Sequence, residues 1–148
     1  MRKEIKAADY AEQIIKSIPK GVLITAKVGD KVNPMTIGWG TYGVQWGKEI
    51  FIAFVRVSRY TRELLDQNPE FTVNIPLGDF DREILKVCGR ESGRDIDKVE
   101  KLNRTLEDSK EISVPGIKEL PLTLECKVVY RQEQVLDLID PRFVKIYY

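Results

Sequence analysis

Hydrophobic positions in the first part of the chain change from a helical to a strand-like period. Apolar residues recur at roughly helical spacing over residues 8–17, and the Pro-Lys-Gly segment at 19–21 ends this run. The apolar, β-branched segment 22–26 follows, and then Gly-Asp turn chemistry within residues 28–32. We therefore expect a short amphipathic helix, a strand and a hairpin.

The next segment combines β-type residues with an unusual number of glycines. Residues 35–44 are rich in Thr, Trp, Tyr and Val but include three glycines, which weaken a strand unless a bulge or close neighbour needs the missing Cβ. Residues 46–49 have turn composition, and the apolar run 50–55 predicts a buried strand. These β-segments and tight turns predict three strands in an antiparallel meander before residue 60.

The rest of the chain combines short helices with further strands. Thr61 is expected to cap a helix that continues to residues 67–69, with Glu63 placing negative charge near its N-terminus. Two short amphipathic helices are expected over residues 79–87 and 95–106, and three strands over residues 71–76, 122–131 and 142–148. Strands at both ends with helices between them favour an α+β, mainly β barrel over a doubly wound parallel sheet. Because no linker or repeat is visible, we expect residues 1–148 to form a single domain.

Composition and charge exclude several classes of function. The 24 basic and 23 acidic side chains nearly cancel, which argues against nucleic acid or an anionic membrane as the main partner. There is no histidine, so a Ser-His triad, a histidine metal site and a histidine base are excluded within this chain. Cys88 and Cys126 fit neither a CxxC pair nor a zinc spacing, and we expect ordinary buried thiols. The charged N-terminus and the lack of a membrane-length apolar stretch predict a cytoplasmic protein.

Polar residues at 56–61 have the chemistry of a phosphate site. Ser58, Arg59, Tyr60 and Thr61 follow a strand at an expected helix N-terminus, where free N–H groups and the helix dipole favour an anion. Hydroxyl donors from Ser58 and Thr61 and a forked guanidinium from Arg56 or Arg59 suit phosphate oxygens. A Ser/Thr cap flanked by arginines is also common on surfaces that bind nothing.

A second polar loop spans residues 89–98. Its glycines allow the backbone to approach a ligand closely, Ser92 can donate a hydrogen bond, and Arg94 and Lys98 add positive charge. Asp95 is an equally good helix N-cap, so the loop could simply start a helix. The two interpretations carry equal weight.

The segment from Asn33 to Gly40 suits a flat ring. Asn33 and Thr36 could donate from their side chains, while Gly38 and Gly40 expose backbone amides that a larger residue would shield. Trp39 and Tyr42 either form a wall of such a slot or belong to the ordinary core, and the core is the commoner role for such aromatics.

Four blocks occur together in one order, over residues 33–40, 55–61, 71–76 and 88–98. In these blocks the chain, from about Pro19 onward, resembles the flavin reductase-like, FMN-binding split-barrel family, and more particularly its flavoredoxin branch. The resemblance implies a split β-barrel with Greek-key connections and inserted short helices. It also implies a homodimer with one FMN per subunit near the subunit interface.

The resemblance also assigns residues to the FMN site, together with the donors inferred above. Asn33, Met35, Thr36, Ile37 and Gly38 would lie along the isoalloxazine ring. The ribityl phosphate would be surrounded by Arg56, Ser58, Arg59, Tyr60 and Thr61, and the pocket would be completed by Ser92, Gly93, Arg94 and Lys98. Related chains usually continue past the position of Tyr148 with a strand that carries an Asp-His pair and helps close the barrel. Either this chain is naturally short or the sequence is incomplete, and a missing strand would expose a sheet edge.

An FMN-dependent oxidoreductase is the leading functional hypothesis, because flavin chemistry needs no histidine nucleophile. Electrons would come from NAD(P)H or a redox protein and pass through the bound FMN, as in a flavin reductase or flavoredoxin. The chain has no GxGxxG after a strand, so a nicotinamide would have to stack on the flavin in an open cleft. The alternatives are a ligand-free interaction module, a redox-inactive flavin-storage protein and an electron carrier without a substrate of its own.

Overall fold

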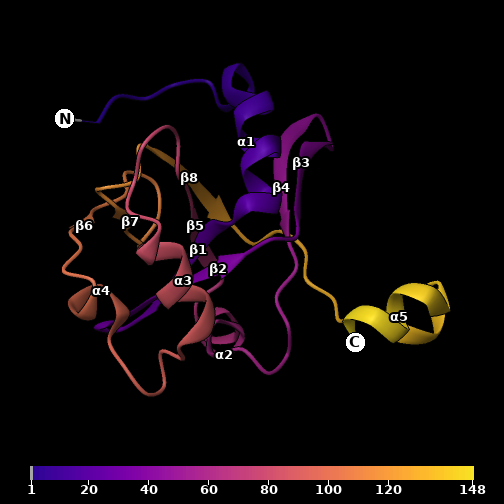
Figure 1. Ribbon diagram of the computed structural model, residues 1–148. Coiled ribbons are helices and arrows are strands. Elements are labelled where there is room, and N and C mark those ends of the chain that lie inside the picture. The colour runs from indigo at the N-terminus through magenta and orange to yellow at the C-terminus, as the bar shows by residue number, and fades with distance from the viewer. Residues whose placement is uncertain (1) are drawn as a thin grey trace.

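The computed structural model describes residues 2–148, and its centre is an antiparallel sheet in the order β2-β1-β5-β8 (Figure 1). These strands span Val22–Val28 (β1), Lys31–Ile37 (β2), Glu70–Ile75 (β5) and Leu122–Lys127 (β8). The predicted hairpin is confirmed: β1 and β2 are joined through Gly29, whose positive φ of 58° suits glycine. The predicted strands at 71–76 and 122–131 are confirmed as β5 and a shorter β8.

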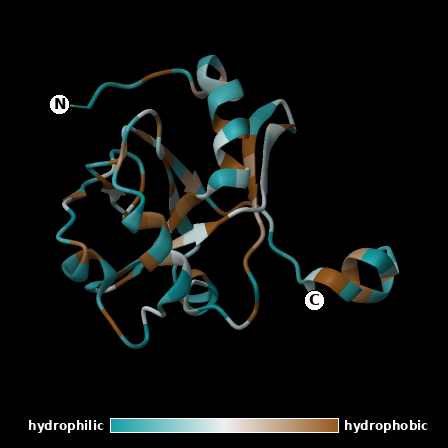
Figure 2. Ribbon diagram, viewed as in Figure 1, coloured by the Kyte–Doolittle hydropathy of each residue, from teal (hydrophilic) through white to brown (hydrophobic). Residues whose placement is uncertain are grey.

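The N-terminal helix covers one side of this sheet. A 3₁₀ turn, Ala7–Tyr10, continues into α1, Ala11–Ser17, and a second 3₁₀ turn spans Ile18–Lys20. Ile14 and Ile18 are buried and pack with Ile24 and Val73 of the central strands. The helix predicted over residues 8–17 is thus confirmed in part: Ile14 faces the core but Ile15 is 54% exposed, and in Figure 2 hydrophobic colour lies along the strands beneath α1.

A separate two-stranded sheet is formed by β3, Gly40–Gln45, and β4, Lys48–Ala53. The expectation of one β-segment over residues 35–44 was wrong, because β2 ends at Ile37 and β3 begins on another sheet at Gly40. The meander region thus has four strands rather than three. The prediction that 50–55 is a buried strand was also wrong: only the face with Phe51 and Ala53 packs on the core, and Ile52 is 44% exposed.

Three short helices pack against the edge of the central sheet. They are α2, Tyr60–Gln67, which contacts β1, and α3, Glu83–Arg90, and α4, Lys98–Lys101, which contact β2. The helix predicted over 79–87 begins later, at Glu83. The helix predicted over 95–106 is only four residues long, and its N-cap is Asp97, which accepts from the Glu100 N–H at 3.0 Å. A short pair, β6 (Leu106–Glu107) and β7 (Gly116–Ile117), follows.

The C-terminal part extends away from the sheet as an arm, residues 128–148 (Figure 1). It contains a 3₁₀ turn, Leu136–Leu138, and the helix α5, Pro141–Tyr147. The prediction of a strand over 142–148 was therefore wrong. Pro141 at the first helical turn and the Asp140 carboxylate, which accepts from the Arg142 N–H at 2.9 Å, start a helix instead.

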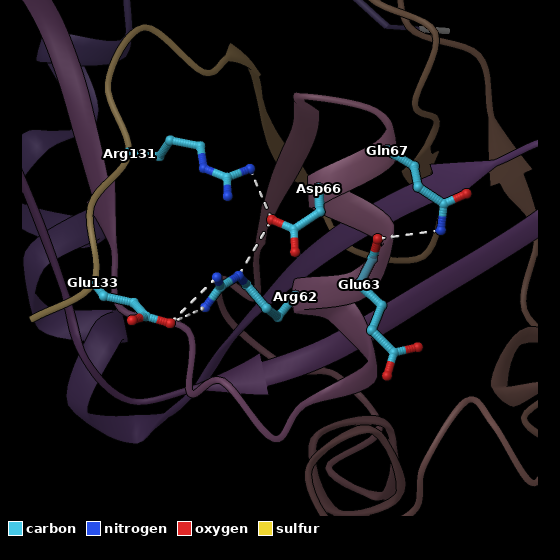
Figure 3. Close-up of polar contacts among 6 residues, drawn as sticks. All are labelled: Arg62, Glu63, Asp66, Gln67, Arg131 and Glu133. Carbon is cyan, nitrogen blue, oxygen red and sulfur yellow. Dashed lines mark hydrogen bonds and ion pairs between the residues drawn. The ribbon is translucent and has the colours of Figure 1, made fainter.

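Ion pairs connect the arm to α2 (Figure 3). Arg62 bonds Asp66 and Glu133, and Arg131 bonds Asp66 at 2.7 Å. In the described part of the chain, residues 2–148, no helix is both long and apolar enough to cross a membrane.

Candidate functional site

Two adjoining cavities lie where β2 meets α2 and the loop before α4. The first, of about 160 Å³, is lined by residues that include Asn33, Met35, Ser58, Arg59, Tyr60, Thr61, Ser92, Gly93, Arg94 and Lys98. The second, of about 280 Å³, is lined by Met35, Thr36, Ile37, Gly38, Trp39, Phe54, Arg56 and Arg59. Met35 and Arg59 border both cavities. Every residue of the FMN set that the resemblance implied therefore lines one cavity or the other, whereas Gly40 lines neither.

The floor of the first cavity is polar and buried. Asn33 on β2 is 4% exposed, and its Nδ2 donates to Oγ1 of the fully buried Thr61 at 3.0 Å. The expectation that Thr61 caps α2 was therefore wrong. Arg59 occupies the N-cap position, and no described side chain caps the helix. Its first backbone N–H groups stay available near the cavity.

Asn33 leaves one buried atom unsatisfied. Its Oδ1 has no hydrogen-bond partner among the described residues. If the amide is rotated by half a turn, the Thr61 hydroxyl donates to Oδ1 and the NH₂ group becomes the free one. In either orientation a buried polar group of Asn33, next to Gly93, is left without a partner, which is costly.

Lys98 places a cation in the wall of the same cavity. Its side chain is 2% exposed, and Nζ donates to the backbone oxygens of Pro34 at 2.9 Å and Cys88 at 3.0 Å. Burial lowers the pKa of Lys98 to about 8, and the nearby positive charge of Arg59 acts in the same direction. Among the described residues no carboxylate lies within ion-pair distance of Nζ, and the nearby Glu91 carboxylate only partly offsets the effect of burial on the pKa of Lys98.

The two cysteines are free, and neither has the environment of a reactive thiol. Burial raises the pKa of Cys88 to about 11 and that of Cys126 to about 12. Cys88 is fully buried and packs with Leu23 and Ile84 in a second small core. The prediction of buried thiols is confirmed for Cys88, whereas Cys126 is only partly buried.

Arg59 stands at the junction of the two cavities. Its Nε donates to Sδ of Met35 at 3.0 Å, and a terminal nitrogen donates to the Gly89 oxygen at 3.1 Å. These contacts fix the guanidinium against β2 and the end of α3. The remaining N–H groups of the fork can serve a ligand on either side.

The 92–94 segment forms the outer wall of the first cavity. A Cβ built on Gly93 would lie 2.4 Å from Asn33 Oδ1 and 2.8 Å from Cδ2 of Tyr60, so only glycine fits there without movement. Ser92 Oγ accepts from the Arg94 N–H at 3.1 Å, and the Arg94 guanidinium lies over the Tyr60 ring, 5.4 Å from its centroid. This loop does more than start α4.

The second cavity is larger and is lined by fewer charged residues. Gly38 has only the Ile18 oxygen, at 3.9 Å, near the position of a Cβ, which leaves room for a close approach. Thr36 was expected to donate to a ligand, but its hydroxyl proton is used on the Leu85 oxygen at 2.6 Å. Trp39 lines the cavity, with the Arg56 guanidinium 5.3 Å from its ring centroid.

Two sequence interpretations of aromatic and glycine positions need correction. Gly40 does not line either cavity: a Cβ there would lie 2.9 Å from Cζ of Phe51, so its small size serves the β3–β4 packing. Tyr42 belongs to the core and bonds Glu49, as the ordinary interpretation held. Phe54, Arg90 and Glu91 line the cavities although the sequence analysis did not assign them, and their adjacency to the assigned segments was the available signal.

The donor set fits a phosphorylated flavin. A buried ammonium, a fixed guanidinium, an uncapped helix start and an unsatisfied amide surround the first cavity, and a larger cavity lined mainly by residues 35–39 adjoins it. Residues 15–138 match the family model described as flavin reductase-like domain. The chain belongs to the flavin reductase-like domain family. Membership of this family supports a flavin-related function at the level of class.

Similar proteins agree with this assignment. An uncharacterised protein of Archaeoglobus fulgidus is 36% identical over 104 residues, which are 70% of this chain and 58% of that protein. The flavoredoxin of Methanosarcina acetivorans is 31% identical with a TM-score of 0.67 and covers 77% of this chain and 59% of its own.

Two further solved structures share the fold of this flavin reductase-like chain. An FMN-binding domain of a flavin reductases-like enzyme from Shewanella baltica has a TM-score of 0.71 at 18% identity, covering 86% and 65% of the two chains. The flavoredoxin of Desulfovibrio vulgaris has a TM-score of 0.68 at 24% identity, covering 76% and 61%. The expected split barrel with inserted short helices is confirmed. The chain spans just under three fifths of the length of the Archaeoglobus fulgidus relative.

Proposed function

We propose that this chain binds FMN across the two cavities and acts as an oxidoreductase that receives electrons from NAD(P)H or a redox protein. The single observation that carries the proposal is the pairing of the cavities. A cavity lined by Arg94 and Lys98 and a cavity lined by residues 36–39 share Arg59 and Met35, so one ligand with an anionic end and a flat ring suits both.

The first cavity suits the phosphate. Arg59 and Lys98 supply positive charge, and Thr61 and the start of α2 supply hydroxyl and N–H groups. Asn33 serves the ribityl hydroxyls through its unpaired amide group. The residues proposed to bind the cofactor are those that were assigned from the sequence and that line the two cavities: Asn33, Met35, Thr36, Ile37, Gly38, Arg56, Ser58, Arg59, Tyr60, Thr61, Ser92, Gly93, Arg94 and Lys98.

The second cavity suits the ring. When bound, FMN supplies hydride acceptance and onward electron transfer. The residues of this chain bind and orient it: Gly38 allows the backbone to lie against the ring, and Met35 and Ile37 exclude water from one side. Arg56, stacked on Trp39 at the rim, places positive charge where negative charge on a reduced ring would be stabilised.

The chain is further proposed to act in the cytoplasm as a homodimer and to form one domain. Reductase and carrier differ in one test. Anaerobic mixing with NADH or NADPH should bleach the flavin of a reductase. The flavin of a carrier should stay oxidised until a reduced redox protein is added.

The visible spectrum of the purified chain tests the proposal. We expect flavin absorption bands that dithionite bleaches, one FMN per chain, and a rise in melting temperature when FMN is added to the stripped protein. At a concentration of about 100 times Kd, binding stabilises the native state by about 2.7 kcal/mol.

Two substitutions test the phosphate cavity. Thr61→Val and Arg59→Ala should each weaken FMN binding by at least about tenfold, since each removes a donor to a charged group. Thr41→Val, at an exposed position of β3, and Arg142→Ala, with a side chain 80% exposed, are the matched controls. A colourless protein whose melting temperature ignores FMN would support the interaction-module alternative and end the proposal.

A further inference from the structure

A charged bridge crosses the first cavity on its solvent side. The Arg94 guanidinium donates to the Ser58 oxygen at 3.3 Å and also pairs with the Glu63 carboxylate. Its cationic face lies over Tyr60, 5.4 Å from the ring centroid. Ser58 and Arg94 both line the cavity, and Glu63 lies one helical turn into α2, so the bridge joins the loop before α4 to the N-terminal part of α2 at the cavity wall.

The exposed fractions of the side chains show that the bridge lies nearer to solvent than the floor of the cavity. Asn33, Thr61 and Lys98 at the floor are 4%, 0% and 2% exposed, whereas the side chains of Arg94 and Glu63 are 41% and 52% exposed. The junction with the second cavity is formed by other residues, Met35 and Arg59. A ligand that enters from the second cavity thus reaches the buried floor first and meets the bridge only if it continues outward.

Glu63 also places negative charge at this exit. Its carboxylate is directed away from the cluster that Arg62, Asp66, Arg131 and Glu133 form on the other side of α2 (Figure 3). Arg94 is already partnered by this carboxylate, so it offers little uncompensated charge to a second anionic group. A second phosphate passing the exit would approach Glu63 and displace the bridge.

We propose that the Arg94–Glu63 bridge makes the site select a flavin that ends in a phosphate monoester over a flavin dinucleotide. This inference rests on the proposed function. The monoester ends inside the cavity on Lys98 and Arg59, where the bridge does not have to open. A dinucleotide has to continue through the exit with its second phosphate and nucleoside, so it breaks the bridge and faces the carboxylate. Selectivity of this kind comes from penalising the wrong ligand.

Titration of FMN and FAD into the flavin-free full chain tests the inference, with quenching of flavin fluorescence as the readout. The quantity of interest is the ratio of the FAD dissociation constant to the FMN dissociation constant. We expect the unaltered chain to prefer FMN and Glu63→Gln to lower the ratio by about three- to tenfold, the range for a partly exposed charge pair. Arg94→Ala removes the bridge but leaves the Glu63 carboxylate without its cation, so it should not lower the ratio as far as Glu63→Gln does.

Asp66→Asn is the matched control. It removes the same negative charge from the same helix one turn further on, but its partners are Arg62 and Arg131 rather than a cavity residue. An unchanged ratio in Asp66→Asn together with a lowered ratio in Glu63→Gln supports the bridge. Equal changes of the ratio in the two variants would show that the loss of one negative charge anywhere on α2 explains the effect, and this would overturn the inference.

The remaining outcomes separate this inference from the proposed function. Binding of neither flavin to the unaltered chain ends the proposed function. Binding of FMN with a ratio that all variants leave unchanged, or no preference in the unaltered chain, overturns the role of the bridge and leaves the flavin site standing.

Discussion

At the scale of single residues, Lys98 gives the site a pH dependence. Its pKa of about 8 reflects a buried ammonium, so the charge that we propose attracts phosphate disappears as pH rises through that value. The phosphate itself is already a dianion above its second pKa of about 6 and does not change over this range.

We predict that FMN affinity of the unaltered chain falls as pH rises from about 7 to about 9.5, by about tenfold or more for the loss of a charged hydrogen-bond donor. Lys98→Arg keeps its charge throughout and should flatten the profile, and Lys98→Met should be weak at every pH. Isothermal titration at a series of pH values measures this. A profile of the unaltered chain as flat as that of Lys98→Arg would contradict the assignment of Lys98 to phosphate.

The same lysine affects the stability of the flavin-free chain in the opposite sense. Its folded-state pKa lies below the ordinary value of 10.5, so the cost of the buried charge is complete below pH 8. Between about pH 8 and pH 10.5 the folded chain loses this proton before the unfolded chain does. The free energy of unfolding therefore increases as pH rises through this range. Lys98→Met removes this contribution, which urea unfolding at pH 7 and pH 9.5 would show as a smaller pH dependence.

Gly93 is predicted to be intolerant of any side chain. Alanine there would place Cβ 2.4 Å from Asn33 Oδ1, so the floor or the outer wall has to move. We expect Gly93→Ala to cost about 1–3 kcal/mol, the usual range for overpacking, and to weaken FMN binding. Gly43→Ala is the matched control, because nothing lies within 4 Å of its Cβ position. Equal unfolding midpoints in urea for the two variants would contradict the crowding at Gly93.

The location of the site was more predictable from sequence than the contacts inside it. The hydroxyl, guanidinium and glycine residues at 33–38, 56–61 and 92–98 do line two adjoining cavities. Dense clusters of these residue types are therefore a usable signal of a site in the sequence. The pairing of Thr61 with Asn33 could not be predicted in this way. It depends on β2 and α2 meeting across 28 residues of sequence, and local capping rules do not contain that contact.

At the scale of elements, the spacing of hydrophobic residues predicted helices and strands correctly where one face of the element is buried, and it failed elsewhere. The run over residues 8–17 and the strand near 71–76 have cores beneath them and form as expected. Residues 142–148 are β-branched and aromatic, yet no described strand pairs with them, and the Asp140-Pro141 start decides for a helix. Strand propensity without a pairing partner is a weak signal.

The contact of the arm with α2 should be loosened by a single substitution. Asp66 accepts from both Arg62 and Arg131, so Asp66→Asn removes the charge that holds residues 128–135 on the helix. We expect faster hydrogen–deuterium exchange in that segment with little change in melting temperature, since exposed ion pairs add little to global stability. Glu12→Gln, which removes an exposed pair with Lys16 on α1, is the control. Unaltered exchange over 128–135 would show that other contacts hold the arm.

At the scale of the whole molecule, the two sheets present different surfaces. The central sheet is covered by α1 on one side and by the short helices near β2, whereas the β3–β4 hairpin packs only one face on the core. Ile52 pairs with Thr41 on the other face and is 44% exposed. Val44 and Trp46 near the tip of the hairpin are 73% and 62% exposed. By strand alternation Val44 lies on the face of Tyr42 and Phe51, so the exposed apolar side chains are spread over both faces and the tip of the hairpin.

A second copy of the chain is the expected partner of this surface, in line with the homodimer proposed above. Ile52→Lys places a charge on the face of the hairpin that points away from the core, and it should shift a dimer to monomer in sedimentation equilibrium, because a buried unpaired charge is costly. Leu106→Lys is the control: Leu106 is 37% exposed but lies on β6, away from the hairpin. Two results would contradict the hairpin as the dimer surface, namely a chain that is already monomeric at micromolar concentration or an Ile52→Lys variant that remains as dimeric as Leu106→Lys. Because the second cavity begins at Trp39, next to this hairpin, loss of the dimer should also weaken FMN binding if the interface supports the ring.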